Sequence, residues 1–281
     1  MQPNIALLLC LTASCTLIAR RIRDDPSSAR LSLLIPTMWI FFEMSRSPDQ
    51  WLNPSSLGSI SLSSMESGNA INQIYYITLL LASFVLLSSR SIDWVALVKE
   101  NLPVCILLCY ELASITWSDY TSISLKRWIR GAALYLVVVT ILSERQPLRA
   151  ISSCLRYSAY LFVPLSVILI KYYPGLSIQY GAFSGAPEYC GAALSKNTLG
   201  ASCLVCGISL LWSMTMQRRK RRGFLRRTAN LDMIMLFITI SLLHMSGSTT
   251  SEATTLLDIE QGPRRATNPW PAGNCWNFQC M

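Results

Sequence analysis

Residues 160–171 read YLFVPLSVILIK, residues 172–175 read YYPG, and residues 195–214 read SKNTLGASCLVCGISLLWSM. The first and third stretches are apolar, and the polar segment between them predicts a loop that joins two membrane helices. Lys196 and Asn197 then lie at the start of the second helix, close to the edge of the hydrocarbon layer. Polar groups at that depth are costly, so they usually have a partner or a function.

Lys196 has two interpretations at this position. A lysine beside a helix N-terminus favours phosphate binding, because the helix dipole and the free backbone N–H groups both attract anions. A lysine at a helix end also snorkels, which places its ammonium group among lipid headgroups and its stem along the apolar surface. The sequence leaves both interpretations open.

The composition of the whole chain is typical of a membrane protein. Of the 281 residues, 52% are hydrophobic and only 14% are charged, whereas soluble domains carry about 25% charged residues. The net charge of +9 would favour nucleic acid as the partner of a soluble protein, but here most cations lie between apolar segments, where they set membrane orientation. We therefore expect an all-α, polytopic helix bundle in the lipid bilayer and no nucleic-acid partner.

Eight apolar segments are candidate transmembrane helices. They lie near residues 4–19, 31–45, 72–88, 101–117, 129–143, 155–171, 193–214 and 231–246. Several are shorter than the roughly 20 residues that cross a bilayer, so we expect them to extend into neighbouring polar residues. The first segment lacks the basic residues that precede the apolar run of a signal peptide, which predicts a retained helix.

The positions of lysine and arginine predict that the N-terminus lies outside. With that orientation, 16 of the 24 basic residues fall in inner segments, including the run from Arg218 to Arg222. The exceptions include outer cations near three helix ends, namely Lys126, Arg127, Arg130, Lys171 and Lys196. In one shared location they would form a cationic pocket for a lipid-linked diphosphate, because guanidinium groups bind phosphate oxygens bidentately. The alternative is contact with lipid headgroups, with Trp117 and Trp128 as interfacial residues.

Cysteine and histidine usage gives little support to a metal or redox centre. Cys203 and Cys206 are spaced as a C-x-x-C pair, but they lie inside an apolar segment, where a free cysteine behaves as a small hydrophobe. The single histidine, His244, lies in the last apolar segment and is more typical of an interhelical hydrogen bond than of catalysis. We expect no metal and no cofactor.

Several motifs follow one another in order along the predicted helices. They are Ile35–Ile40, Ser45–Leu52, Leu112–Asp119, Ser124–Ile129, Tyr160–Pro174, Gly185–Gly191, Lys196–Gly200 and Leu242–Ser251. Their order and spacing, over roughly residues 15–257, resemble the O-antigen ligase and O-antigen polymerase family of bacterial envelope polysaccharide assembly. The likeness is strongest to the exopolysaccharide-polymerase-like branch of that family.

The resemblance implies a multi-pass, metal-independent glycosyltransferase of the bacterial inner membrane. Such an enzyme moves a glycan from undecaprenyl diphosphate to an acceptor on the outer face, in lipopolysaccharide or exopolysaccharide synthesis, alone or within a polysaccharide-assembly complex. The residues that would bind the diphosphate are Lys126, Arg127, Arg130, Lys196 and Asn197, with Asn197 orienting a hydroxyl or capping a helix. Other positions that match family motifs are Trp117, Ser118, Ser246 and Ser248.

The chain departs from the family pattern in two places. Position 195 is serine, where relatives commonly have histidine before Lys-Asn. After Ser251 the family continues into a large external loop with an arginine and the histidine that acts as base, whereas residues 258–281 here are polar and rich in proline and glycine. This composition predicts a disordered tail after a helical domain over residues 1–257.

Three functional hypotheses follow, and no catalytic residue is assigned. The first is a polysaccharide ligase or polymerase, and the second is a truncated, inactive relative that lacks the external catalytic loop. A transporter is favoured least, because the sequence has no pair of interrupted helices in matching halves of the chain.

Overall fold

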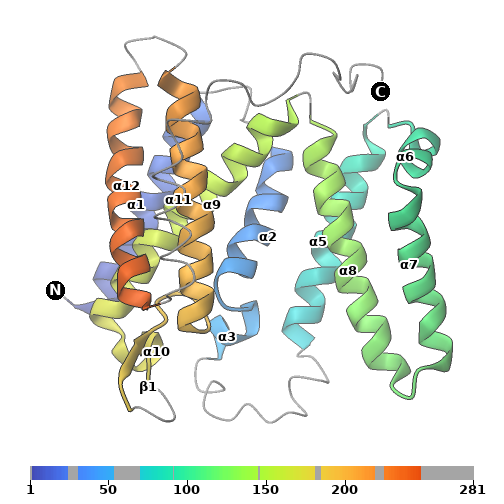
Figure 1. Ribbon diagram of the computed structural model, residues 1–281, viewed down its shortest axis with the longest axis horizontal. Helices are drawn as coiled ribbons and strands as arrows, with labels where there is room; N and C mark the ends of the chain where they lie inside the picture. The colour runs from blue at the N-terminus through green and yellow to red at the C-terminus, as the bar shows by residue number, and fades with distance from the viewer. Residues whose placement is uncertain are drawn as a thin grey trace. The chain divides into compact units, whose positions relative to one another are not determined.

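The computed structural model describes residues 2–24, 31–53, 70–90, 92–144, 146–180, 185–218 and 225–247. These residues are mostly helical (Figure 1). The helices are α1 (Pro3–Asp24), α2 (Leu34–Met44), α3 (Pro48–Leu52), α5 (Ala70–Ser88), α6 (Trp94–Glu100), α7 (Leu102–Ser114), α8 (Thr121–Leu142), α9 (Pro147–Tyr172), α10 (Pro174–Ser177), α11 (Lys196–Arg218) and α12 (Leu225–Ser246). Short 3₁₀ turns at Leu31–Leu33 and Ile115–Trp117 precede α2 and follow α7. Strands β1 (Ile178–Tyr180) and β2 (Pro187–Tyr189) form an antiparallel hairpin.

A helix overlaps each of the eight apolar segments predicted from the sequence. Among the described residues, four helical stretches are long and apolar enough to cross a membrane, namely Pro3–Arg20, Ala70–Ser88, Pro147–Tyr172 and Lys196–Thr215. Shorter apolar helices are Leu34–Met44, Leu102–Trp117 and Asn230–Ser246. These lengths fit a helical membrane protein, while the number of spans, about eight, stays a prediction.

The chain divides into two compact units that interleave along the sequence. The first unit contains α1, the stretch Ile40–Arg46 that includes the end of α2, α9 from Ile151 onward, the hairpin and helices α10 to α12. The second unit contains Leu31–Trp39 and helices α3, α5, α6, α7 and α8. The sequence alone predicts one helical domain over residues 1–257, because local apolar patterns carry no information about which helices pack together.

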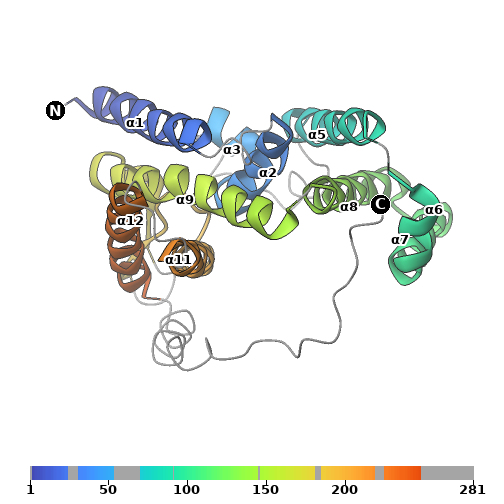
Figure 2. The same cartoon turned by 90° about the horizontal axis from the view of Figure 1, so that it is seen from above.

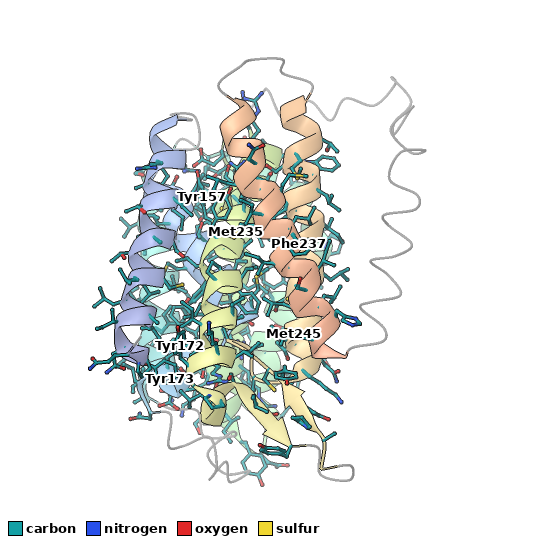
Figure 3. The ribbon with its side chains drawn as sticks, turned by 90° about the vertical axis from the view of Figure 1, so that its left-hand side faces the viewer. Tyr157, Tyr172, Tyr173, Met235, Phe237 and Met245 are labelled. Carbon is teal, nitrogen blue, oxygen red and sulfur yellow. The ribbon has the colours of Figure 1, made fainter. Side chains whose placement is uncertain are left out.

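Helix α9 is the central helix of the first unit. Figure 2 shows α1 on one side of α9, with α11 and α12 on the other. The residues of α9 that face its neighbours are almost fully buried, among them Tyr160, Phe162 and Val163. At the end of α9, Tyr172 and Tyr173 lie beside the start of α1 (Figure 3), where the Tyr173 hydroxyl donates to Asn4 Oδ1 at 2.7 Å.

Polar side chains link these helices within the apolar interior. Tyr160 on α9 donates a hydrogen bond to Asp232 Oδ1 on α12, and the two residues are 1% and 0% exposed. Arg156 on α9 donates from Nη1 to Ser213 Oγ on α11 at 2.9 Å. Polar groups in a membrane bundle must find partners inside the protein, so these bonds fix the register of α9 against α11 and α12.

In the second unit α5 packs against α8 (Figure 1). Its apolar core contains Trp39, Leu79, Ala133 and Val137. Small residues such as Ala133 let the helices approach closely, while the large ring of Trp39 fills the space beside them.

An ion pair and several hydrogen bonds join the ends of three segments in this second unit. Glu144 is 8% exposed and accepts hydrogen bonds from the Arg90 guanidinium and, at 2.6 Å, from Ser32 Oγ. Arg90 also donates from Nη1 to the carbonyl of Thr140 at 3.2 Å. The network thereby joins Arg90, two residues after α5, to the end of α8 and to the turn before α2. Removal of one member of a largely buried ion pair is expensive, because the other charge stays behind.

We expect Glu144→Ala to lower the free energy of unfolding by about 3 kcal/mol, since it takes the carboxylate away from a guanidinium that remains largely buried. Reversible unfolding in mixed detergent micelles measures this change. Glu100→Ala, at an exposed position at the end of α6, is the matched control and should shift stability by less than about 0.5 kcal/mol. Equal, small effects of both substitutions would contradict a stabilising role for the network.

Candidate functional site

The segment between α9 and α11 is a folded return loop, defined here as residues 173–180 and 185–195. It consists of α10 and the hairpin, in which Ile178 pairs with Tyr189 and Tyr180 with Pro187. The carbonyl of Ser177 accepts hydrogen bonds from the backbone N–H groups of Cys190, at 2.7 Å, and Gly191, at 3.2 Å. The sequence predicts only a polar loop here, because strands of three residues are too short to show a clear alternation of polar and apolar side chains.

Arg46 is a buried cation in contact with the return loop. It lies two residues after the end of α2 and is 2% exposed. Its guanidinium donates to the carbonyl of Leu176, to the carbonyl of Gly191 at 3.3 Å, and through Nε to the carbonyl of Ala193 at 3.3 Å. Burial lowers the pKa of the Arg46 guanidinium, but the group stays protonated at neutral pH because an arginine pKa starts far above 7.

Gly191 allows the return loop to lie directly on α9. Its φ of +54° belongs to the left-handed region that glycine adopts without strain. A Cβ atom at this position would lie 2.9 Å from Cβ of Ser166, which is too close for ordinary contact. The next residue, Ala192, donates its N–H to Ser166 Oγ at 3.3 Å. Both the backbone conformation and the close approach therefore require glycine here.

Ser195 caps the start of α11. The N–H of Thr198 donates to Ser195 Oγ at 3.2 Å, and the two hydroxyl oxygens of these residues are 2.9 Å apart. Serine is among the best N-cap residues, so the cap gives a physical reason for serine at position 195. The sequence offered Asn197 as a possible cap, but the capping side chain is that of Ser195, and Asn197 is exposed in the first turn.

Lys196 forms an ion pair at the first residue of α11. Its Nζ lies 2.7 Å from Oε1 of Glu188 on β2, and the two side chains are 37% and 26% exposed. The ammonium group is thus partly accessible and partly neutralised. The sequence indicates Lys196 but not Glu188, because only the hairpin brings this carboxylate back to the start of α11.

In the second unit the predicted cations lie near the start of α8. Arg127 is exposed and Lys126 is half-buried. Arg130 lies over the ring of Tyr76, with its guanidinium carbon 5.0 Å from the ring centroid. The indole N–H of Trp128 donates to the carbonyl of Leu108 at 3.1 Å, which fixes α8 against α7. Arg130 is exposed as well, so Arg127 and Arg130 are both accessible.

The other motif residues of this unit precede α8. Trp117 is 64% exposed, and its ring centroid is 6.3 Å from that of Tyr110. Ser118 Oγ is 2.8 Å from Ser124 Oγ, so the motif serine ties the turn before α8 to its first turn. An exposed tryptophan just before a helix with exposed cations is the composition expected at a membrane–water interface.

The last motif, Leu242–Ser251, begins near the end of α12. Ser246 is buried and donates to the carbonyl of Leu243 at 2.6 Å. His244 lies in the last turn of α12 and is exposed. Ser248, the basic positions 219–222 and the predicted tail over residues 258–281 lie outside the described residues.

Each unit thus holds one group of predicted site residues. Lys196 and Asn197 lie together at the start of α11 in the first unit, while the predicted residues of the 117–130 segment lie together in the second. A single pocket made by both groups stays a prediction.

Comparisons with protein-family models, with curated proteins and with solved structures found no match. A proposal of function therefore depends on the order of motifs in the sequence and on the geometry of the two groups of residues.

We expect Ser195→Ala to lower the free energy of unfolding by about 1 kcal/mol, because the N–H of Thr198 loses its capping oxygen. Ser195→Asn should retain most of the stability, since asparagine caps equally well. Unfolding of both variants under identical detergent conditions makes the comparison. Equal loss in the two variants would contradict the capping role.

Proposed function

We propose that this chain is a protein of bacterial envelope polysaccharide assembly, and that it binds a glycan carried on undecaprenyl diphosphate at the outer face of the inner membrane. The order of motifs supports the family, and the membrane-length helices fit such a protein. The observation that carries the proposal is an accessible ammonium group, that of Lys196, at the first residue of a capped helix on a folded return loop.

The start of α11 has the chemistry that a diphosphate requires. The ammonium of Lys196 supplies a positive charge, and the helix N-terminus adds the partial positive charge of its dipole. Ser195 occupies the N–H of Thr198, which leaves the first backbone N–H groups of the helix for an anion. Asn197 is exposed beside them and adds a neutral donor.

Glu188 tunes this site. Its carboxylate lies 2.7 Å from the Lys196 ammonium, so an incoming phosphate must compete with it. Because the pair is partly exposed, solvent screens it and the competition costs little. The pair thereby orients the ammonium group of Lys196 without preventing access to it.

Arg127 is the second proposed phosphate-binding residue. Its exposed guanidinium presents a planar fork of donors that matches phosphate oxygens. Lys126 adds charge on the next residue, and the exposed ring of Trp117 suits the depth at which lipid headgroups lie. Arg130, which stacks on Tyr76, contributes less in this proposal.

We propose a role in binding the lipid-linked donor and assign no catalytic residue for glycosyl transfer. Glycosyl transfer to a hydroxyl benefits from a general base. The one histidine of the chain, His244, lies in the last turn of a helix, whereas the family resemblance implies a base in an external loop. The second candidate is a relative that binds the lipid-linked donor without transferring the glycan.

We expect Lys196→Ala and Arg127→Ala each to weaken binding of undecaprenyl diphosphate by roughly tenfold, because each removes a charge-assisted hydrogen bond. The protein is measured in nanodiscs of neutral phosphatidylcholine, with titration of the lipid followed by tryptophan fluorescence. Lys99→Ala removes an exposed cation from α6, on the predicted inner side, and is the matched control. Unchanged affinity in both site variants would overturn the phosphate site.

Competition with phosphatidylglycerol separates a specific site from general attraction to anionic lipid. Displacement of undecaprenyl diphosphate at equal concentrations of phosphatidylglycerol would assign these cations to ordinary headgroup contacts. Retention of the diphosphate at a large excess of phosphatidylglycerol would support the proposal.

We expect Glu188→Gln to tighten diphosphate binding by about two- to fivefold, since the amide no longer competes for the ammonium of Lys196. The same titration in neutral nanodiscs measures it, with Glu100→Gln as the control at an exposed position. Weaker binding by Glu188→Gln would mean that the carboxylate assists the ligand and would contradict the competition.

A further inference from the structure

Arg46 connects the end of α2 to the part of the return loop that leads into Lys196. The Arg46 guanidinium contacts the carbonyls of Gly191 and Ala193, and Ala193 is three residues before Lys196. Such a short segment transmits a backbone shift directly, because only Leu194 and the N-cap Ser195 separate the fixed carbonyl from the first residue of α11.

Two further contacts attach the end of α2 to α11 itself. Ser202 Oγ donates to the carbonyl of Met44 at 3.2 Å. The thiol of Cys206 lies 3.9 Å from the sulfur of Met44. The end of α2 therefore contacts both the approach to α11 and, at Ser202 and Cys206, the second and third turns of that helix.

We propose that Arg46 is a positioning residue for phosphate binding at Lys196. It holds the backbone carbonyls of residues 176, 191 and 193 in one arrangement, so that the ammonium of Lys196 lies at the outer end of α11 within reach of a diphosphate. The ligand in this statement rests on the proposed function, whereas the positioning of the return loop is tested independently of it.

The chemistry of the contact explains why arginine stands there. A buried charge is costly, and an apolar side chain of similar size would fill the same volume without that cost. The planar guanidinium, however, directs several donors in fixed directions and so reaches carbonyls on α10 and on both sides of Ala192 at once. A lysine ammonium is a point charge that cannot span them, which makes Arg46→Lys the informative substitution.

The reactivity of the Cys190 thiol indicates whether the return loop is closed or displaced. It is 0% exposed, and its N–H is bound to the carbonyl of Ser177. Burial raises the pKa of the Cys190 thiol, and the thiolate is the form that reacts with maleimides. A closed loop therefore leaves Cys190 unreactive, while a displaced loop exposes it.

The first test labels the intact protein in nanodiscs with a membrane-impermeant maleimide and quantifies the Cys190 peptide by mass spectrometry. We expect Arg46→Lys to raise the labelling rate of Cys190 by at least about tenfold, because the loop opens locally when its carbonyls lose their donors. Arg149→Lys makes the same chemical change at an exposed position and should leave the rate unchanged. A wild-type labelling rate in Arg46→Lys would overturn the positioning role.

Gly191→Ala displaces the same segment without altering Arg46. The added methyl group would meet Ser166 in a strained backbone conformation, so we expect faster Cys190 labelling here too. Gly175→Ala lies in the same return loop, where nothing lies within 4 Å of the added atom, and should label like the wild type. Wild-type labelling in Gly191→Ala would contradict a loop that depends on these backbone contacts.

A double-mutant cycle separates positioning from general stability. We expect Arg46→Lys alone to weaken undecaprenyl diphosphate binding by roughly as much as Lys196→Ala, with no further loss in the double variant, because both act through one ammonium group. Independent, additive losses would overturn the proposal. If Arg46→Lys opens the loop but Lys196→Ala binds normally, the phosphate site fails while the loop-positioning role of Arg46 is supported.

Discussion

The burial of a single charge, the guanidinium of Arg46, constrains the return loop between α9 and α11. A charge that is 2% exposed must have polar partners, and here three backbone carbonyls of the return loop supply them. The guanidinium finds these partners only where the end of α2 lies against both α10 and the segment after the hairpin. That meeting fixes the carbonyls of Gly191 and Ala193 a few residues before Lys196 at the start of α11.

The same physical rule organises the remaining polar groups. Where the surroundings are apolar, hydrogen-bonding groups find their partners within the protein. Asp232 therefore accepts from Tyr160 between two helices of the first unit, and Glu144 accepts from Arg90 and Ser32 in the second. These few directional contacts specify helix register, which apolar packing alone specifies weakly because most aliphatic side chains fit many neighbours.

The proposed function, in contrast, uses charged side chains that remain accessible to solvent. Lys196 is held by Glu188 but remains 37% exposed, and Arg127 is exposed at the start of α8. A cation that is oriented yet still in reach of solvent can exchange one anion for another at low cost. In the proposed function Arg46 and Lys196 have separate roles, since Arg46 is buried and holds the backbone whereas Lys196 is accessible to an anion.

The sequence by itself determined where the helices lie and which cations stand at their ends, because apolar length and charge are local properties of the chain. It also placed Lys196 at the first residue of a helix. Only the tertiary structure decided what those charges touch. Arg46 reaches a carbonyl 147 residues away, and Lys196 meets Glu188 only because a hairpin folds back. Such partners depend on how segments pack, and no local pattern of residues specifies that.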